Sequence, residues 1–163
     1  MTLERILSTT STNRNLVLRL VLALVVFPHG AQQLFGWFGG YGLTGTMGYF
    51  TDTVRVPYVL GFLVVLAESV GALALAAGFF TRVAAAGIGA SMLGAMVLVH
   101  AGNGWFMNWF GTFPAGREGM EFFLPLLALS AVLVVEGAGR ASVDAFVAAR
   151  LRSPSLAPAI AIR

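Results

Sequence analysis

The side chains best suited to chemistry in this sequence are two histidines and two glutamates, each associated with a different apolar segment. Glu68 lies near the middle of residues 56–79, a run with no other charged residue. The run is long enough to span a bilayer, which takes about 20 residues. A carboxylate at that depth costs several kcal/mol unless it is paired, protonated or hydrated. Glu68 is therefore the first candidate functional residue.

Depth along the predicted helices places other polar residues in the same half of the membrane. With a rise of about 1.5 Å per residue and a hydrocarbon core about 30 Å thick, His29 lies roughly 10 Å and Glu68 roughly 16 Å below the outer surface. His100 lies near the outer boundary, Glu121 begins the last apolar segment, and Gln32 lies about one turn above His29. Each helix thus brings one imidazole or carboxylate to the outer half of the bundle.

Clustered imidazole and carboxylate groups can bind a divalent metal, relay protons or form hydrogen bonds to a quinone carbonyl. In helical bundles such sites are built from side chains on facing helices. The candidate ligand- or cofactor-binding residues are therefore His29, Gln32, Glu68, His100 and Glu121. The candidate metal ligands are His29, Glu68, His100 and Glu121.

Each of these residues also has a purely structural interpretation. The histidines can be satisfied by backbone or water near the surface, and Glu121 can complement the dipole of the helix that it begins. Glu68 can pair with Arg19, although Arg19 lies about one turn from the inner surface and can extend to it. Pro28 favours a cavity beside His29, because proline removes a helical hydrogen bond and broken spans are tolerated where they line cavities.

The composition is that of an integral membrane protein. Hydrophobic residues make up 58% of the 163 residues and charged residues only 10%, against about 25% charged residues in a soluble domain. All basic residues are arginines, and the small net charge of +3 indicates membrane topology rather than nucleic-acid binding. The absence of cysteine excludes disulfides and iron–sulfur clusters within the chain. Any redox role must therefore use a bound cofactor or a partner subunit.

Four apolar segments predict the elements that position these residues. We expect an all-α fold, a four-helix transmembrane bundle formed by a single domain, residues 1–163. The expected spans are residues about 16–35, 57–79, 83–100 and 120–135, of which the last is short for a full crossing. Only Phe80, Thr81 and Arg82 separate the second and third spans, so these two must form a tight antiparallel hairpin.

The arginines predict the orientation of the bundle. With four spans both termini lie on one side, which holds eight arginines, whereas the other side holds only Arg55 and Arg117. We therefore expect N-in/C-in topology in a bacterial-type cytoplasmic (inner) membrane, with cytoplasmic termini. After span four, Ser142 is a candidate N-cap, and residues about 142–152 predict a short amphipathic helix on the cytoplasmic membrane surface.

Two other patterns bear on packing. The outer loops, residues 36–55 and 101–119, are rich in aromatic residues, which we interpret as an interfacial belt. A lid over an outward-facing pocket or a partner surface is the alternative. Span three carries Ala86, Ala90 and Gly94 at four-residue spacing, which lets helix backbones approach closely. We expect this row to pack the hairpin.

An ordered set of motifs resembles the DoxX family of small four-helix membrane proteins, over nearly the whole chain. The motifs are residues 28–40 (PHGAQQLFGWFGG), 42–46 (GLTGT), Glu68, 78–82 (GFFTR), His100, 103–109 (NGWFMNW), 118–121 (EGME) and 137–144 (GAGRASVD).

The resemblance implies a relation to the membrane subunits of thiosulfate:quinone oxidoreductase. The family often has Lys where this chain has Gln33, and Tyr-His where this chain has Phe122 and Phe123. The missing His is unfavourable for a metal site or a proton relay, and the missing Lys is unfavourable for anion binding.

We therefore expect an integral membrane subunit of DoxX type, redox-linked through quinone or metal at the His/Glu cluster. Its alternatives are a non-catalytic anchor or scaffold for a partner enzyme, and a carrier of a small hydrophobic ligand. The expected partners are the lipid bilayer and other copies or subunits in a homo-oligomer or heteromeric membrane complex, with no nucleic acid. Within the cluster, Glu68 is predicted to face the bundle interior within reach of His29 or His100, directly or through water.

Overall fold

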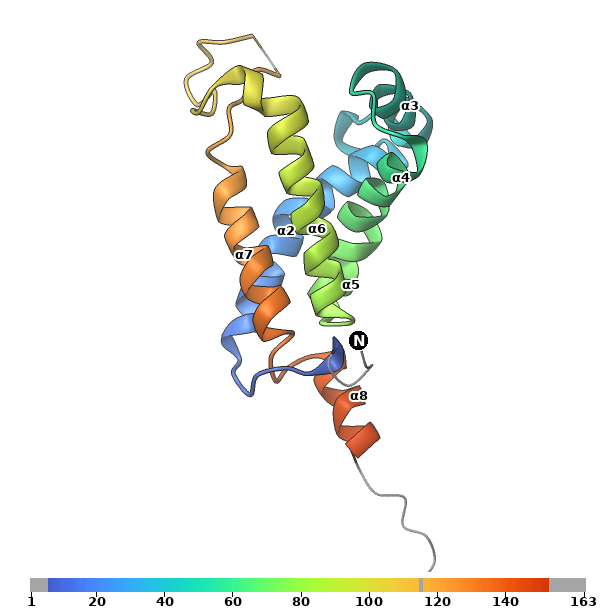
Figure 1. Ribbon diagram of the computed structural model, residues 1–163, viewed down its shortest axis with the longest axis vertical. Coiled ribbons are helices and arrows are strands. Elements are labelled where there is room, and N and C mark those ends of the chain that lie inside the picture. Colours follow the sequence, from blue (N-terminus) through green and yellow to red (C-terminus); the bar gives the residue numbers. More distant parts are fainter. Residues whose placement is uncertain (1–5, 115, 153–163) are drawn as a thin grey trace, which may run out of the picture.

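The chain folds into helices that run side by side along the long axis of the molecule (Figure 1). The computed structural model describes residues 6–114 and 116–152, and this part of the chain contains no β-strand. The α-helices are α2 (Arg14–Phe35), α3 (Gly42–Gly48), α4 (Tyr58–Leu66), α5 (Ala72–Ala77), α6 (Thr81–Ala95), α7 (Phe123–Glu136) and α8 (Val143–Arg152). Short π- and 3-10-helical segments connect or extend them, namely η1 (Trp37–Gly39), η2 (Tyr49–Thr53), η3 (Ala67–Gly71), η4 (Met96–His100) and η5 (Ala101–Asn103). The prediction of an all-helical fold is confirmed.

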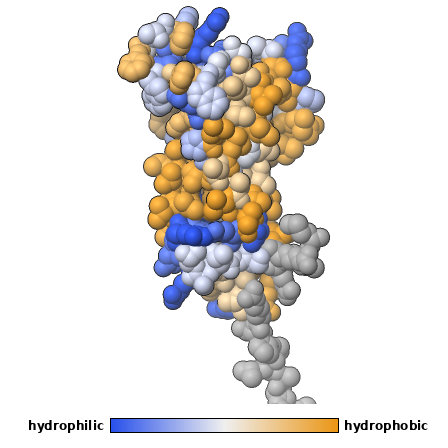
Figure 2. Space-filling view, turned by 60° about the vertical axis from the view of Figure 1, so that its left-hand side comes forward, coloured by the Kyte–Doolittle hydropathy of each residue, from blue (hydrophilic) through white to orange (hydrophobic). Residues whose placement is uncertain are grey.

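Within the described residues, three helical stretches are long and apolar enough to cross a membrane. They are Arg14–Phe35, which is α2, Tyr58–Ala77, which joins α4, η3 and α5, and Thr81–Asn103, which joins α6, η4 and η5. Apolar side chains cover the middle of the face in Figure 2, and polar residues gather toward both of its ends. This arrangement is typical of a membrane-embedded protein. α7 is a shorter apolar helix, so a fourth crossing stays a prediction.

α7 begins at Phe123, later than the predicted start near residue 120. The residues before it pair instead with the first part of the second outer loop: the Glu121 N–H donates to the Trp105 carbonyl at 2.9 Å, and the Gly119 N–H donates to the Phe106 carbonyl at 3.1 Å. Because these backbone groups are satisfied within the loop, residues 120–122 stay outside the helix. Pro125 then lies in the first turn, where its missing N–H leaves no helical acceptor unpaired.

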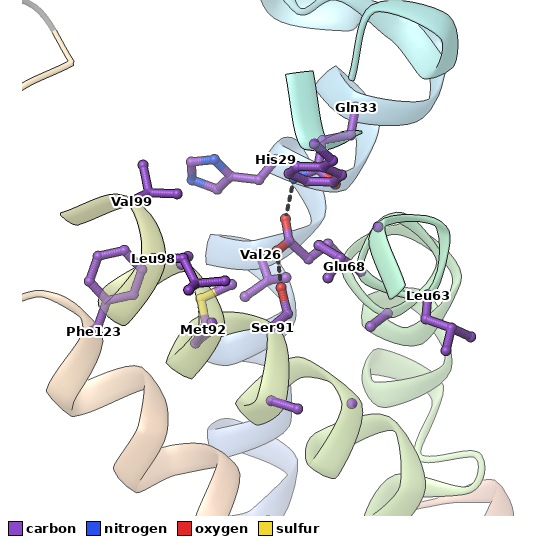
Figure 3. Close-up of a pocket in the computed structure, with 18 of the residues that line it drawn as sticks. Val26, His29, Gln33, Leu63, Glu68, Ser91, Met92, Leu98, Val99 and Phe123 are labelled. Atoms are coloured by element: carbon purple, nitrogen blue, oxygen red, sulfur yellow. Dashed lines mark hydrogen bonds between the residues drawn. The ribbon is translucent and has the colours of Figure 1, made fainter. Parts of the chain in front are cut away.

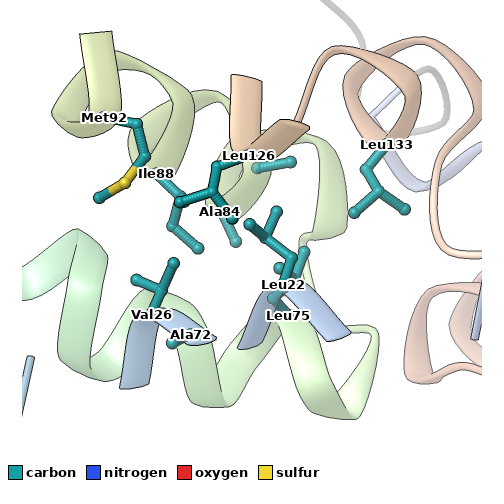
Figure 4. Close-up of a cluster of buried hydrophobic side chains, with 10 residues drawn as sticks. Leu22, Val26, Ala72, Leu75, Ala84, Ile88, Met92, Leu126 and Leu133 are labelled. Atoms are coloured by element: carbon teal, nitrogen blue, oxygen red, sulfur yellow. The ribbon is translucent and has the colours of Figure 1, made fainter. Parts of the chain in front are cut away.

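The hydrophobic core forms where α2, α5, α6 and α7 meet (Figure 4). Its buried members are Leu22, Val26, Ala72, Leu75, Ala84, Ala85, Ile88, Met92, Leu126 and Leu133. Leu22, Ile88 and Leu133 are completely buried. α4 contributes no residue to this cluster, so the side of the bundle between α4 and α6 is not filled by the core.

Arg19 holds one helix end in place. Its guanidinium is completely buried and donates to the carbonyls of Leu75 at 3.1 Å, Ala76 at 2.9 Å and Ala141 at 2.6 Å. The first two carbonyls belong to the last turn of α5, whose carbonyls are beyond the reach of the helix's own N–H groups. Arg19 is therefore satisfied by backbone carbonyls and does not pair with Glu68.

Asp144 attaches the start of α8 to the hairpin. Its carboxylate is 1% exposed and accepts hydrogen bonds from the Phe80 N–H at 2.7 Å and the Thr81 N–H at 2.9 Å, at the beginning of α6. Ser142 Oγ accepts from the Ala145 N–H at 3.1 Å, which confirms Ser142 as a cap of α8. The first turn of α8 is therefore anchored in the bundle. The placement of the rest of α8 on a membrane surface stays a prediction.

Several arginines make contacts with the end of α7 and with the segments that flank α2 and α8. Arg14 forms an ion pair with Glu136, Arg82 donates to the Val135 carbonyl at 2.7 Å, and the Arg140 N–H donates to the Thr12 carbonyl at 3.0 Å. The clustering agrees with the grouping used to predict topology. The side of the membrane that this end faces stays a prediction.

Candidate functional site

Glu68 lies in η3, a π-helical turn in the middle of the second apolar stretch. Its side chain is 4% exposed, which confirms the prediction that it faces the bundle interior. π-Helical turns are rare and occur frequently at functional sites. Both the position and the local backbone therefore single out this carboxylate.

Two uncharged donors hold the Glu68 carboxylate (Figure 3). Gln33 Nε2 donates to Oε2 at 2.7 Å, and Ser91 Oγ donates to Oε1. The two bonds join α2, η3 and α6, and they lower the cost of burying the carboxylate. No hydrogen bond links Glu68 to either imidazole within the described part of the chain. Glu68 therefore does not pair directly with His29 or His100, and the predicted contact through water stays a prediction.

Gly30 explains why Gln33 reaches Glu68. A Cβ atom on Gly30 would lie 2.2 Å from the backbone carbonyl oxygen of Glu68, so α2 and η3 touch backbone to backbone. Gln33 follows Gly30 by three residues and therefore lies on the same face of α2. His29 is the neighbour of Gly30 and is turned about 100° away from that contact.

A cavity of about 1130 Å³ lies beside Glu68, bounded by α2, the second apolar stretch and α6. Most of its wall is apolar, and the polar side chains that reach it include His29, Gln33, Glu68, Ser91 and His100. Ligand pockets typically combine such an apolar wall with a few polar groups that fix orientation. The cavity is thus large enough, and lined suitably, for a lipophilic molecule with a polar head.

Two polar groups at the cavity are available to a ligand. Gln33 Oε1 is buried and has no hydrogen-bond partner among the described residues, although buried amide oxygens are normally satisfied. His29 is exposed, and no hydrogen bond from its imidazole is found in residues 6–114 and 116–152. In Figure 3 the ring of His29 extends on the side of Val99 and away from the Glu68 carboxylate. A ligand oxygen beside both side chains would find an acceptor and a ring nitrogen.

The structure gives other predicted site residues a role in the loops. His100 Nδ1 lies 2.7 Å from the carbonyl oxygen of Glu118, so its ring is satisfied by backbone although it lines the cavity. Glu121 accepts from Trp109 Nε1 at 2.7 Å and from the Met107 N–H at 2.9 Å, and thereby fixes the second outer loop.

Gln32 is also directed into a loop. Its Nε2 donates to the Phe38 carbonyl at 3.3 Å, which ties the end of α2 to η1. Neither Gln32 nor Glu121 belongs to the cavity wall. Of the five predicted ligand-binding residues, the cavity therefore brings together His29, Glu68 and His100.

The predicted metal ligands do not form a cluster. Within the described ranges, no three His, Asp or Glu side chains lie close enough together to hold a metal ion. His100 is bonded to a carbonyl, Glu121 is turned toward Trp109, and Glu68 is bonded to Gln33 and Ser91. The metal hypothesis therefore gains no support from this arrangement.

The sequence reasoning did not include Ser91 and gave Gln33 no role in holding Glu68. A signal was present, because Glu68 precedes and Ser91 follows the hairpin by nearly the same number of residues, which places them at the same depth on antiparallel helices. The alignment of Gln33 with Glu68 depends on the contact at Gly30, for which the sequence carried no comparable signal.

Fold and site together define a small, all-helical membrane protein with a ligand-sized cavity between its helices. The sequence model of the DoxX family matches residues 15–101, and the chain belongs to this family. The match contains His29, Gln33, Glu68, Ser91 and His100, and it ends before the second outer loop and α7. No curated protein and no solved structure matches the chain.

Proposed function

We propose that this DoxX-family protein is a membrane subunit that binds a quinone-like lipophilic ligand in the cavity beside Glu68, as part of a redox-linked system. One observation carries the proposal: an apolar cavity at membrane depth contains a buried, unsatisfied acceptor, Gln33 Oε1, next to a hydrogen-bonded carboxylate. An empty apolar site would need no such groups. A ligand with a ring hydroxyl would donate to the Gln33 oxygen and satisfy it.

The lining fits the two parts of such a ligand. Apolar side chains such as Leu63, Val64 and Met92 suit a ring and a hydrocarbon tail, whereas His29 and Gln33 can form hydrogen bonds with ring oxygens. The quinone supplies the redox chemistry, and the side chains of this chain bind and orient it. Because the chain has no cysteine, electrons would be exchanged with a partner subunit.

A carrier of a small hydrophobic ligand is the second candidate function. The same cavity favours it, because ligand binding alone needs no electron donor or acceptor nearby. The two functions share a binding site and differ in whether a redox partner is required. The third candidate, a non-catalytic anchor or scaffold, leaves the cavity and the unpaired Gln33 oxygen without a purpose.

We propose in addition that the protein acts within a homo-oligomer or a heteromeric complex in a bacterial-type inner membrane, with cytoplasmic termini. The orientation is based on the arginine-rich end, which holds Arg14, Arg82 and Arg140. The described part of the chain has little structure outside its apolar helices for an enzymatic site of its own.

The proposal predicts that Glu68→Gln keeps the fold but weakens ligand binding. Without the carboxylate, the orientation of the Gln33 amide is no longer fixed, and its oxygen no longer reliably faces the cavity. We expect about tenfold weaker binding of a decyl-substituted hydroquinone to the protein in lipid nanodiscs under anaerobic conditions, which corresponds to about 1.4 kcal/mol. Isothermal titration calorimetry against empty nanodiscs would measure it.

Glu136→Gln is the matched control, because Glu136 pairs with Arg14 at the far end of α7 and lies outside the cavity. Its binding constant should stay within about twofold of the unsubstituted protein, which is a change of about 0.4 kcal/mol. If the unsubstituted protein binds no more probe than empty nanodiscs do, the proposed function is wrong. If Glu68→Gln binds as well as Glu136→Gln, the ligand lies elsewhere.

A further inference from the structure

The cavity opens sideways, between α4 and α6. Part of its wall consists of large apolar side chains that are also exposed on the outside of the membrane-spanning stretches, with exposed fractions between 53% and 62%. These residues are Leu60, Leu63, Val70, Val83 and Leu98. Because they come from both sides of the gap, the opening lies within the apolar surface rather than at a polar end of the molecule.

The small residues of α6 create this gap. A Cβ atom on Gly87 would lie 3.4 Å from the Ala67 Cβ, which is ordinary contact, whereas one on Gly94 would meet no atom within 4 Å. The two arms of the hairpin thus touch near Gly87 and separate toward Gly94. Ala90 and Gly94 line the cavity, so the predicted role of their row in packing the hairpin is wrong for this part of α6.

The outer end of the cavity is bordered by the second outer loop. Met107 and Glu118 contribute to its wall, and the bond from the Met107 N–H to Glu121 holds this loop in position. The carbonyl of Glu118 is in turn bonded to His100 and to Asn103 Nδ2. The side gap, by contrast, is crossed at its inner end by the hydrogen bond from Ser91 to Glu68, and Gly94 leaves its outer part open.

The head of the ligand meets acceptors at the inner end of this gap. Gln33 Oε1 is an acceptor without a donor, and its amide is fixed in that orientation because Nε2 donates to Glu68. The carboxylate is itself an acceptor that already receives two bonds. A head that donates a hydrogen bond therefore suits this position better than one that only accepts.

We infer that the cavity is loaded from the bilayer through the gap between α4 and α6, and that it takes the hydroxyl-bearing, reduced form of a tailed ring compound in preference to the carbonyl form. The tail lies along Ala90 and Gly94, and a ring hydroxyl donates to Gln33 Oε1. This inference rests on the proposed function, because it concerns the same site, and it adds the route of entry and the form of the ligand.

The test uses decyl-substituted hydroquinone and benzoquinone as probes, under anaerobic conditions and in lipid nanodiscs. The unsubstituted protein should bind the hydroquinone at least about fivefold more tightly, as expected for one hydrogen bond to a buried acceptor. Gln33→Met, which keeps the length but removes the acceptor, should abolish this preference. Gly94→Trp should reduce the affinity for both probes about tenfold or more by filling the gap.

Ala90→Leu provides a second, milder obstruction one turn away, in case Gly94→Trp fails to fold. Leu24→Trp is the control for an added ring on the apolar surface, since Leu24 is 76% exposed on α2 and lies outside the cavity wall. Unchanged affinity in a folded Gly94→Trp or Ala90→Leu variant would overturn side entry. Equal or tighter binding of the benzoquinone would overturn the preference for the hydroxyl form. Binding of neither probe to the unsubstituted protein would overturn the proposed function itself.

Discussion

Gly30→Ala should lower the stability of the bundle more than any other single methyl group added to it. The new Cβ would lie 2.2 Å from the Glu68 carbonyl oxygen and 2.4 Å from the Ser69 backbone nitrogen, so α2 and η3 would have to separate. Overpacking costs about 1–3 kcal/mol and occasionally more. We expect the upper part of that range, because backbone on both sides has little freedom to move.

The same substitution should also abolish binding at the cavity, because separating α2 from η3 breaks the bond between Gln33 and Glu68. Thermal unfolding in mild detergent, followed by circular dichroism, measures the stability. Gly94→Ala is the control, since its added Cβ meets open space and alanine favours helix by about 1 kcal/mol. If Gly30→Ala unfolds at the temperature of the unsubstituted protein, the close contact between α2 and η3 is incorrect.

Asp144→Ala should be the second most damaging substitution. It removes both acceptors for the Phe80 and Thr81 N–H groups and leaves these donors buried at the start of α6. Hydrogen bonds to charged groups contribute about 1.5–3 kcal/mol each. We expect a loss of about 2–4 kcal/mol in the free energy of unfolding. The loss is smaller than two full hydrogen bonds because the partly buried Phe80 N–H can bond to water instead.

Asp144→Asn separates this capping role from general disruption of α8. An asparagine keeps one acceptor oxygen. The midpoint of denaturant-induced unfolding of Asp144→Asn should therefore lie between those of Asp144→Ala and the unsubstituted protein. Limited proteolysis should cut Asp144→Ala first at the hairpin and at residues 137–142. Equal unfolding midpoints for Asp144→Ala and the unsubstituted protein would show that α8 does not hold the hairpin.

The parts of the fold that follow from local sequence were predictable. The length of the apolar runs identified the three long stretches that can span a membrane. The short link at Phe80 to Arg82 identified the hairpin formed by the second and third of them. Ser142 was recognisable as a cap because capping depends on residues that are neighbours in sequence. The burial of Glu68 followed from the cost of exposing a carboxylate to lipid.

The partners of the polar residues were not predictable, because depth does not determine helix rotation. Contact at Gly30 turns Gln33, and not His29, toward Glu68. Glu121 bonds to Trp109 and Met107 of the second outer loop and so does not face the bundle. Helical spacing in the sequence does not predict such loop contacts. Several residues of the DoxX motifs consequently form two groups with different roles.

One group of motif residues braces the arginine-rich end of the bundle. It consists of the segment 137–144 and the hairpin motif, residues 78–82. Asp144 accepts from the N–H groups of Phe80 and Thr81, and Arg82 donates to the Val135 carbonyl. The other group surrounds the cavity, with His29 and Gln33 on α2 and Glu68 on η3. Ligand binding should therefore depend strongly on the second group and only through folding on the first.

Photoaffinity labelling tests the central claim, a ligand in the cavity beside Glu68, most directly. The protein in nanodiscs is irradiated with a decyl-tailed benzoquinone that carries a photoreactive azide on its ring, and the labelled peptides are identified by mass spectrometry. The account predicts adducts within residues 25–33, 60–71 and 87–99, which supply most of the cavity wall, and their loss when unlabelled decyl hydroquinone is added in excess. Adducts confined to the exposed α2 side chains Val17, Leu20, Val21 and Leu24, or adducts that excess hydroquinone does not reduce, would contradict it.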